Sequence, residues 1–145
     1  MGRWIGIDYG SRRIGLAIAD TRGRIASPAA TLPATDSANR NAQNVLAWAE
    51  ENEAGGFVVG LPLNMADGSD SDQTKIVRAF AAELAKVARL PVELWDERLS
   101  SFQADKFMDA AQVPRSQRKR WRDRLAAQVI LQTFLDARLD AHQPE

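Results

Sequence analysis

The sequence predicts an α/β protein in which helices flank a mixed sheet. Three short apolar runs near the amino end, at 3–9, 14–19 and 24–32, are separated by turn-forming residues and predict three antiparallel strands. Two more strand-like runs, at 57–61 and 91–95, each follow a segment with helical periodicity. A strand–helix–strand crossover joins parallel neighbours. We therefore expect a three-layer sandwich around a five-stranded sheet, with three antiparallel strands first and two parallel strands after them.

Helical patterns fill most of the remaining chain. Apolar residues recur at spacings of three and four over 72–89, and helix-forming segments also cover 36–52 and 116–139. Thr35 or Asp36 is placed to cap the helix at 36–52, and Gly55-Gly56 is expected to stop it. Ser100 is placed to cap a further helix that Pro114 closes.

The composition leaves carboxylates as the main candidate catalytic groups. The 145 residues include no cysteine and one histidine, His142, which excludes disulfides, a thiol nucleophile and Cys-ligated metal sites. The length predicts one domain over residues 1–145. No apolar run approaches the roughly 20 residues of a bilayer span, and the amino end lacks a signal-peptide pattern. We therefore expect a cytoplasmic protein with no membrane partner.

The charges are unevenly distributed along the chain. The 19 basic and 19 acidic residues cancel overall, but residues 115–124 (RSQRKRWRDR) contain six basic residues and one acidic residue. Arg12 and Arg13 belong to a second basic group. This sidedness predicts contact with a polyanion, and a solvated helix face is the alternative interpretation of the run at 115–124.

Two candidate catalytic acids lie at strand ends. Strand alternation places Asp8 on the same face as Gly6 and Gly10, so small neighbours leave its carboxylate uncovered. The alternative is that Asp8 only caps the following turn. Glu97 directly follows the strand at 91–95, and its alternative role is a surface ion pair with Arg98.

The third candidate acid, Asp123, lies on the last helix. It shares a helical face with Ala127, Ile130 and Phe134, so it should point toward the protein. A carboxylate in that position must be neutralised, paired with an arginine such as Arg122 or Arg124, or bound to a metal.

Acids brought together from two sheet positions and one helix suit hard divalent cations with oxygen ligands. We therefore expect Mg²⁺ or Mn²⁺, most simply as two ions. Two such ions about 3.5–4 Å apart would activate water and stabilise the leaving oxygen, which is phosphodiester hydrolysis.

Four motifs in this order resemble the YqgF/RuvX family of ribonuclease H-like bacterial proteins. The motifs are GIDYG with RIGLA and Asp20, VGLPLNM with DGS at 67–69, DERLSS at 96–101, and Asp123 with the following AA and IL pairs. The resemblance covers almost the whole chain. It implies the ribonuclease H-like fold and a divalent-metal nuclease site whose acids are Asp8, Glu97 and Asp123. It also implies one of two roles, maturation of the 5′ end of 16S ribosomal RNA precursor in ribosome biogenesis or resolution of Holliday junctions.

The expected partner is structured RNA or branched DNA. We expect contacts to nucleic acid from Arg12, Arg13, Asn64, Arg98, Arg118, Lys119, Arg120 and Arg122. One departure from the family pattern is Ala66, which separates Met65 from Asp67 and alters a loop that could affect substrate choice. The sequence leaves open RNA or DNA, the cleavage position, and whether the protein is a monomer or a homodimer.

Two other classes of function compete with a nuclease. GIDYG also resembles the first phosphate loop of actin-like ATPases, which would make the protein a nucleotide-binding phosphotransferase. Such proteins usually enclose ATP between two domains, and this chain has the length of one and no Walker lysine motif. A non-catalytic binding module is the other alternative, although all three acids are present.

Overall fold

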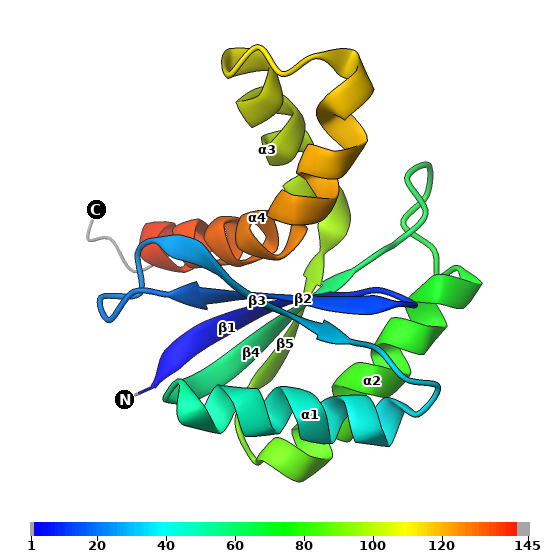
Figure 1. Ribbon diagram of the computed structural model, residues 1–145, viewed down its shortest axis with the longest axis vertical. Coiled ribbons are helices and arrows are strands. Elements are labelled where there is room, and N and C mark those ends of the chain that lie inside the picture. The colour runs from blue at the N-terminus through cyan, green and yellow to red at the C-terminus, as the bar shows by residue number, and fades with distance from the viewer. Residues whose placement is uncertain (1, 142–145) are drawn as a thin grey trace.

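A five-stranded mixed sheet forms the centre of the molecule (Figure 1). The computed structural model describes residues 2–141, with the side chains of 100–103, 122–124 and 140–141 outside the description, so His142 is not placed. The strands are β1 (Arg3–Tyr9), β2 (Arg13–Ala19), β3 (Ala26–Pro33), β4 (Ala54–Leu61) and β5 (Val92–Asp96), in the order β3-β2-β1-β4-β5. The first three are antiparallel, and β4 pairs in parallel with both β1 and β5. The predicted sheet is therefore confirmed.

Helices cover both faces of this sheet and give it three layers. The helical elements are α1 (Ala38–Glu51), α2 (Asp72–Ala88), α3 (Glu97–Ala110), a short 3-10 turn η1 (Arg115–Gln117) and α4 (Arg118–Ala141). Helices α1 and α2 pack on each other and cover one face, whereas the second part of α4 crosses the other face (Figure 1). Helix α3 packs mainly on α4 and stands away from the sheet (Figure 1).

Strand alternation divides the apolar residues of the sheet between two cores. Ile5 and Ile7 of β1 are fully buried against the layer of α1 and α2, together with Phe80 of α2. Val58 of β4 lies in the opposite core, which α4 fills with Ile130 and other apolar side chains. Asp8, one residue after Ile7, therefore belongs to the face that α4 covers.

The structure corrects two expectations about α1 and β4. Ser37, and not Thr35 or Asp36, caps α1, because its hydroxyl accepts a hydrogen bond from the backbone N–H of Arg40. The pair Gly55-Gly56 does not stop this helix but belongs to β4. A β-carbon on Gly56 would lie 2.8 Å from the Trp4 ring, so the strand uses glycine there to accommodate the indole.

The start of α3 is a third correction. The helix begins at Glu97, three residues before the expected cap at Ser100, because the Asp96 carboxylate accepts a hydrogen bond from the Arg98 N–H. As a result β5 runs directly into α3, and Glu97 is the first helical residue. In the described part of the chain, no helix is both long enough and apolar enough to span a membrane.

Candidate active site

Two predicted acids, Asp8 and Glu97, lie at the same edge of the sheet. Strands β1, β4 and β5 are parallel and end at Tyr9, Leu61 and Asp96. Asp8 is the next-to-last residue of β1, and Glu97 follows β5 without a break. Ligand and active sites in open α/β sheets gather at these carboxyl ends. The two acids are separated only by β4.

Gly60 of β4 allows Glu97 to reach Asp8 across the strand between them. A β-carbon on Gly60 would lie 3.5 Å from Glu97 Oε1 and 2.4 Å from Ile130 Cδ1, so a side chain there would compete with both neighbours. The Glu97 carboxyl group instead extends over β4 and hydrogen-bonds to the Asp8 side chain. Sequence reasoning missed Gly60, although a glycine inside the buried run at 57–61 was a usable signal.

Burial and the neighbouring acid both disfavour the ionised form of Glu97. Removal from water, then the negative charge of Asp8 and their hydrogen bond, raise the pKa of Glu97 to about 7. Near neutral pH the pair therefore shares a proton, which Glu97 donates to Asp8. Without that proton the two negative charges repel each other, and a cation between them would relieve the repulsion.

Helix α4 passes directly over this edge of the sheet. A β-carbon on Gly6 would lie 2.8 Å from the Ala127 carbonyl oxygen, which shows how closely the helix approaches β1. Asp123 precedes Ala127 by one helical turn in α4. The side chains of Asp123 and Arg122 lie outside the described ones, so both assignments remain predictions.

The residues present fit a hard divalent cation. Asp8 and Glu97 supply carboxylate oxygens at one partly buried position, and such oxygens are the ligands that Mg²⁺ and Mn²⁺ prefer. Among the side chains that the structure describes, no three acids or histidines meet at one point. A third carboxylate would have to come from a side chain outside that set, and Asp123 is the predicted one.

Arg98 pairs with Asp96 and not with Glu97. Its Nη2 lies 2.7 Å from Asp96 Oδ2, and its Nε also donates to this carboxylate. The hydrogen bonds and the charge of Arg98 lower the pKa of Asp96 below its usual range. The structure therefore shows Arg98 paired with Asp96 in place of the alternative Glu97–Arg98 ion pair.

The loop after β4 folds back on itself beside Arg98. The Asn64 side chain donates to Ser69 Oγ at 2.8 Å, and Ser69 in turn donates to Asp67. Gly68 has φ = 72°, and a β-carbon there would lie 3.0 Å from Arg98 Nη2. Ala66 occupies the turn that these hydrogen bonds close. The Asn64 amide and the Arg98 guanidinium, both predicted to contact nucleic acid, thus have internal partners.

The predicted basic contacts fall into two separate places. Arg12 and Arg13 are exposed at the turn between β1 and β2, on the same edge as Asp8 and Glu97. Arg118, Lys119 and Arg120 lie at the start of α4, on the part of the molecule that stands away from the sheet (Figure 1). Of these two groups, the structure places the first at the edge that holds the two acids.

Comparison with known proteins identifies the family. The model of the family RuvX, described as Holliday junction resolvase, matches residues 2–137. The chain belongs to the RuvX family. A relative of this RuvX member from Rhodopseudomonas palustris (strain BisB5) is named "Putative pre-16S rRNA nuclease" and is 42% identical over 93% of this chain and 83% of its own length. A relative of the same name from Koribacter versatilis (strain Ellin345) is 40% identical over 99% of this chain and 93% of its own length.

Solved structures of RuvC share the fold of this RuvX member. RuvC of Thermus thermophilus superposes with a TM-score of 0.57 at 15% identity over 99% of both chains. The same protein in complex with a Holliday junction substrate gives a TM-score of 0.56 and also 15% identity, over the full length of both chains. At this identity the likeness confirms the ribonuclease H-like fold alone.

Proposed function

We propose that this protein is a cytoplasmic, divalent-metal-dependent nuclease that hydrolyses phosphodiester bonds in structured nucleic acid, and that it processes the 5′ end of 16S ribosomal RNA precursor. The observation that carries this proposal is the pairing of Asp8 with Glu97 at the carboxyl edge of the sheet. Two acids held together at the cost of a raised pKa for Glu97 are typical of a functional site and not of a structural ion pair. The names of the relatives support the choice of substrate.

Asp8, Glu97 and Asp123 are the residues that would hold Mg²⁺ or Mn²⁺, most simply as a pair of ions. Bound there, the metal would lower the pKa of an attacking water and stabilise charge on the leaving oxygen. Glu97 must lose its proton to serve as a ligand, so rising pH through about 7 should favour the competent state.

The other residues at this edge would bind the substrate and shape the site. Arg12 and Arg13, exposed beside β1, would bind phosphates near the cleaved bond. Ala127 and Ile130 of α4 lie against the glycines beneath the acids and close that side of the site with apolar groups. Arg98 would hold the loop at 62–71 close to Glu97, since its guanidinium lies against Gly68.

Resolution of Holliday junctions is the second candidate function. It is favoured by the description of the family and by the shared fold with RuvC, whose structure was solved with a Holliday junction substrate. Two strands of a junction are cut symmetrically, so this activity predicts a two-fold homodimer, whereas trimming of an RNA end requires only a monomer.

One experiment tests both functions. The parent protein is incubated in Mn²⁺ with an RNA that carries the 5′ leader and start of 16S ribosomal RNA and, separately, with a four-way DNA junction. We expect faster cleavage of the RNA; faster cleavage of the junction would favour the second function. Asp8→Asn should abolish cleavage but keep most of the binding, because phosphate affinity comes mainly from Lys and Arg. Glu51→Gln, an exposed acid at the end of α1, is the matched control and should cleave like the parent.

A further inference from the structure

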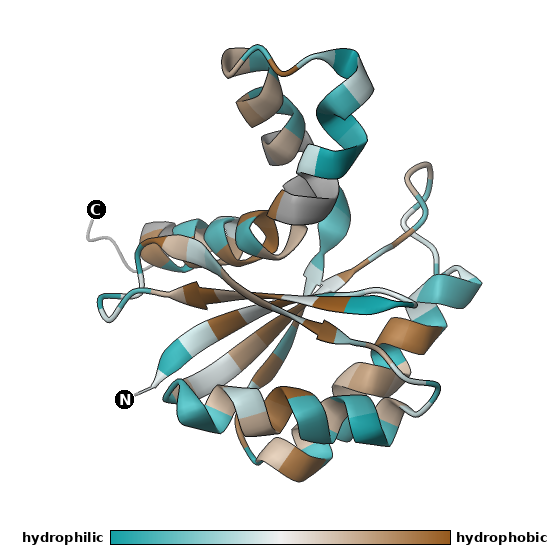
Figure 2. Cartoon of the chain, viewed as in Figure 1, coloured by the Kyte–Doolittle hydropathy of each residue, from teal (hydrophilic) through white to brown (hydrophobic). Residues whose placement is uncertain are grey.

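The second half of helix α3, the turn η1 and the first turn of α4 form an arm, residues 104–121, that stands away from the sheet (Figure 1). Ala104 and Met108 of α3 are buried between its two helices, and Val113 closes its tip. Figure 2 shows the start of α4 as strongly hydrophilic. The arm therefore has an apolar interior of its own and a polar surface at its far end.

Arg118 links the start of α4 to α3 and to the turn that follows α3. Its Nη1 lies 2.6 Å from Asp109 Oδ1, and its Nε donates to the Val113 carbonyl oxygen at 3.1 Å. Its side chain is only 26% exposed. Arg118 was predicted to contact nucleic acid, but the structure gives its guanidinium two partners within the arm.

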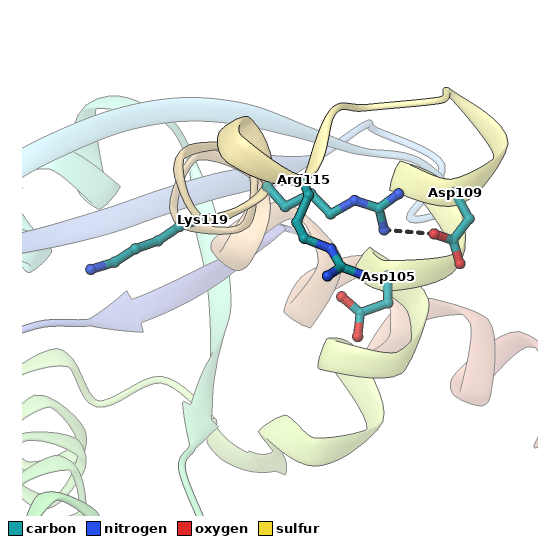
Figure 3. Close-up of a pocket in the computed structure, with 5 residues that line it drawn as sticks. Asp105, Asp109, Arg115 and Lys119 are labelled. Atoms are coloured by element: carbon teal, nitrogen blue, oxygen red, sulfur yellow. Dashed lines mark hydrogen bonds and ion pairs between the residues drawn. The ribbon is translucent and has the colours of Figure 1, made fainter.

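A charged cavity of about 630 Å³ lies beside the Arg118–Asp109 ion pair (Figure 3). It is lined by Asp105, Asp109, Arg115, Arg118 and Lys119. The Lys119 side chain extends away from both carboxylates (Figure 3). Lys119 and its neighbour Arg120 are exposed, so the fixed Arg118 is followed by two cations that point to solvent. Two adjacent exposed cations at the start of a helix are suited to bind phosphates.

The length of α3 sets the distance between this cluster and the two acids. Asp105 and Asp109, which line the cavity, follow Glu97 on the same helix. At a rise of 1.5 Å per residue the cavity lies about 12–18 Å from Glu97 along the axis. In B-form DNA the phosphates along one strand are spaced by about 3.4 Å of helix axis. A duplex that lies along α3 would therefore place phosphates beside this cavity about four to five base pairs from a phosphate held at Glu97.

We propose that the arm binds backbone phosphates of a duplex about four to five base pairs from the cleaved bond, so that the substrate is a stem that continues at least this far past the cleavage site. This proposal rests on the proposed nuclease function, because the number of base pairs is counted from the phosphate that is cleaved at Glu97. It makes Lys119 and Arg120 phosphate-binding residues and Arg118 a positioning residue.

The test compares two RNA hairpins that share one cleavage site, with stems that continue for about 3 and about 10 base pairs on the same side. Affinity is measured in chelator, which prevents cleavage. It is measured at several salt concentrations, because the slope of log affinity against log salt concentration reports the number of phosphate contacts. For the parent, the long stem should give a salt slope steeper by about 0.9 for each additional phosphate bound. The double variant Lys119→Ala with Arg120→Ala should lose about 1.8 of the slope on the long stem.

Lys86→Ala provides the matched control, because Lys86 is a highly exposed lysine of α2 on the opposite side of the sheet. It should retain the difference between the stems. Equal slopes for both stems with the parent would overturn the proposal, and this result needs no variant. An unchanged slope in a double variant that melts like the parent would also overturn it. Cleavage of the long stem by the parent in Mn²⁺ is measured in parallel, and its absence would contradict the nuclease function instead.

Discussion

The burial of Glu97 beside Asp8 lowers the free energy of unfolding once Glu97 is ionised, so its effect on stability depends on pH. In the folded protein burial and Asp8 raise the pKa of Glu97 to about 7 from an ordinary value of 4.5. The folded state therefore binds a proton that the unfolded state releases between these two values. The stability that this proton contributes is complete below pH 4.5 and is lost as the pH rises through 7. A structural role alone would not explain why an acid is held there.

Glu97→Gln should remove this dependence in the metal-free protein. Relative to the variant, the parent should lose stability between pH 4.5 and 7 by up to about 1.4 kcal/mol per pH unit, with no further relative change above 7. Near pH 8 the variant should be at least as stable as the parent. Urea unfolding in chelator at pH 4.5, 6 and 8 measures the difference, and two parallel stability curves would contradict the raised pKa.

Gly6 determines how closely α4 approaches the acids. A β-carbon there would lie 2.6 Å from Leu131 Cβ and 2.8 Å from the Ala127 carbonyl oxygen, neither of which can move without the helix. Gly6→Ala should therefore destabilise the protein by about 1–3 kcal/mol. Gly15→Ala is the matched control, because its β-carbon would meet Ala127 and Asp8 only at 3.7 Å. Thermal melts in chelator compare the two variants, and an equal effect would contradict the close approach of α4 at Gly6.

At the scale of single elements, Arg118 is expected to order the arm. Arg118→Ala removes the ion pair to Asp109 and the hydrogen bond to the Val113 carbonyl oxygen. Because these contacts join α3 to α4 and not to the sheet, backbone amides of residues 107–117 should exchange hydrogen faster while those of the sheet stay protected. Hydrogen exchange measures this directly. Unchanged exchange in the arm would show that Ala104, Met108 and Val113 hold it without Arg118.

The ends of the elements show where sequence patterns are sufficient and where they fail. The strong periodicity at 72–89 predicts α2 within one residue of its bounds, and the buried run at 57–61 predicts β4. The cap of α3 was predicted four residues late, at Ser100 instead of Asp96, since both are good capping residues and only the path of β5 decides between them. The partner of Arg118 was equally hidden, because Asp109 comes close only through the turn at η1.

At the scale of the whole molecule, the mixed five-stranded sheet and the proximity of Asp8 and Glu97 could be predicted from the sequence, whereas the order of the strands came from the structure. Parallel strands must end at one edge, so acids at their carboxyl ends meet regardless of sequence separation. What the sequence could not show is the proton that the two acids share, because it depends on burial and on the space above Gly60. The separation of the basic groups, with Arg12 at the edge and Lys119 on the arm, depends in turn on the path of α3.

The central claim is that Asp123 completes one metal centre with Asp8 and Glu97. In chelator, replacing a ligand by a neutral amide relieves the repulsion between like charges, so Asp123→Asn should melt at the same temperature as the parent or higher. Saturating Mn²⁺ should stabilise the parent by mass action, by about 2.7 kcal/mol at 100 times the dissociation constant, and the variant by less. If Asp123 instead forms a structural ion pair with Arg122 or Arg124, the substitution should lower stability with and without metal.

Thermal melts of the parent and of Asp123→Asn, each in chelator and in Mn²⁺, are therefore the decisive measurement. A metal centre predicts that Mn²⁺ stabilises the variant less than the parent and that the variant loses none of its stability in chelator. A loss of stability in Asp123→Asn that is the same in chelator and in Mn²⁺ would contradict the assignment of Asp123 as a ligand.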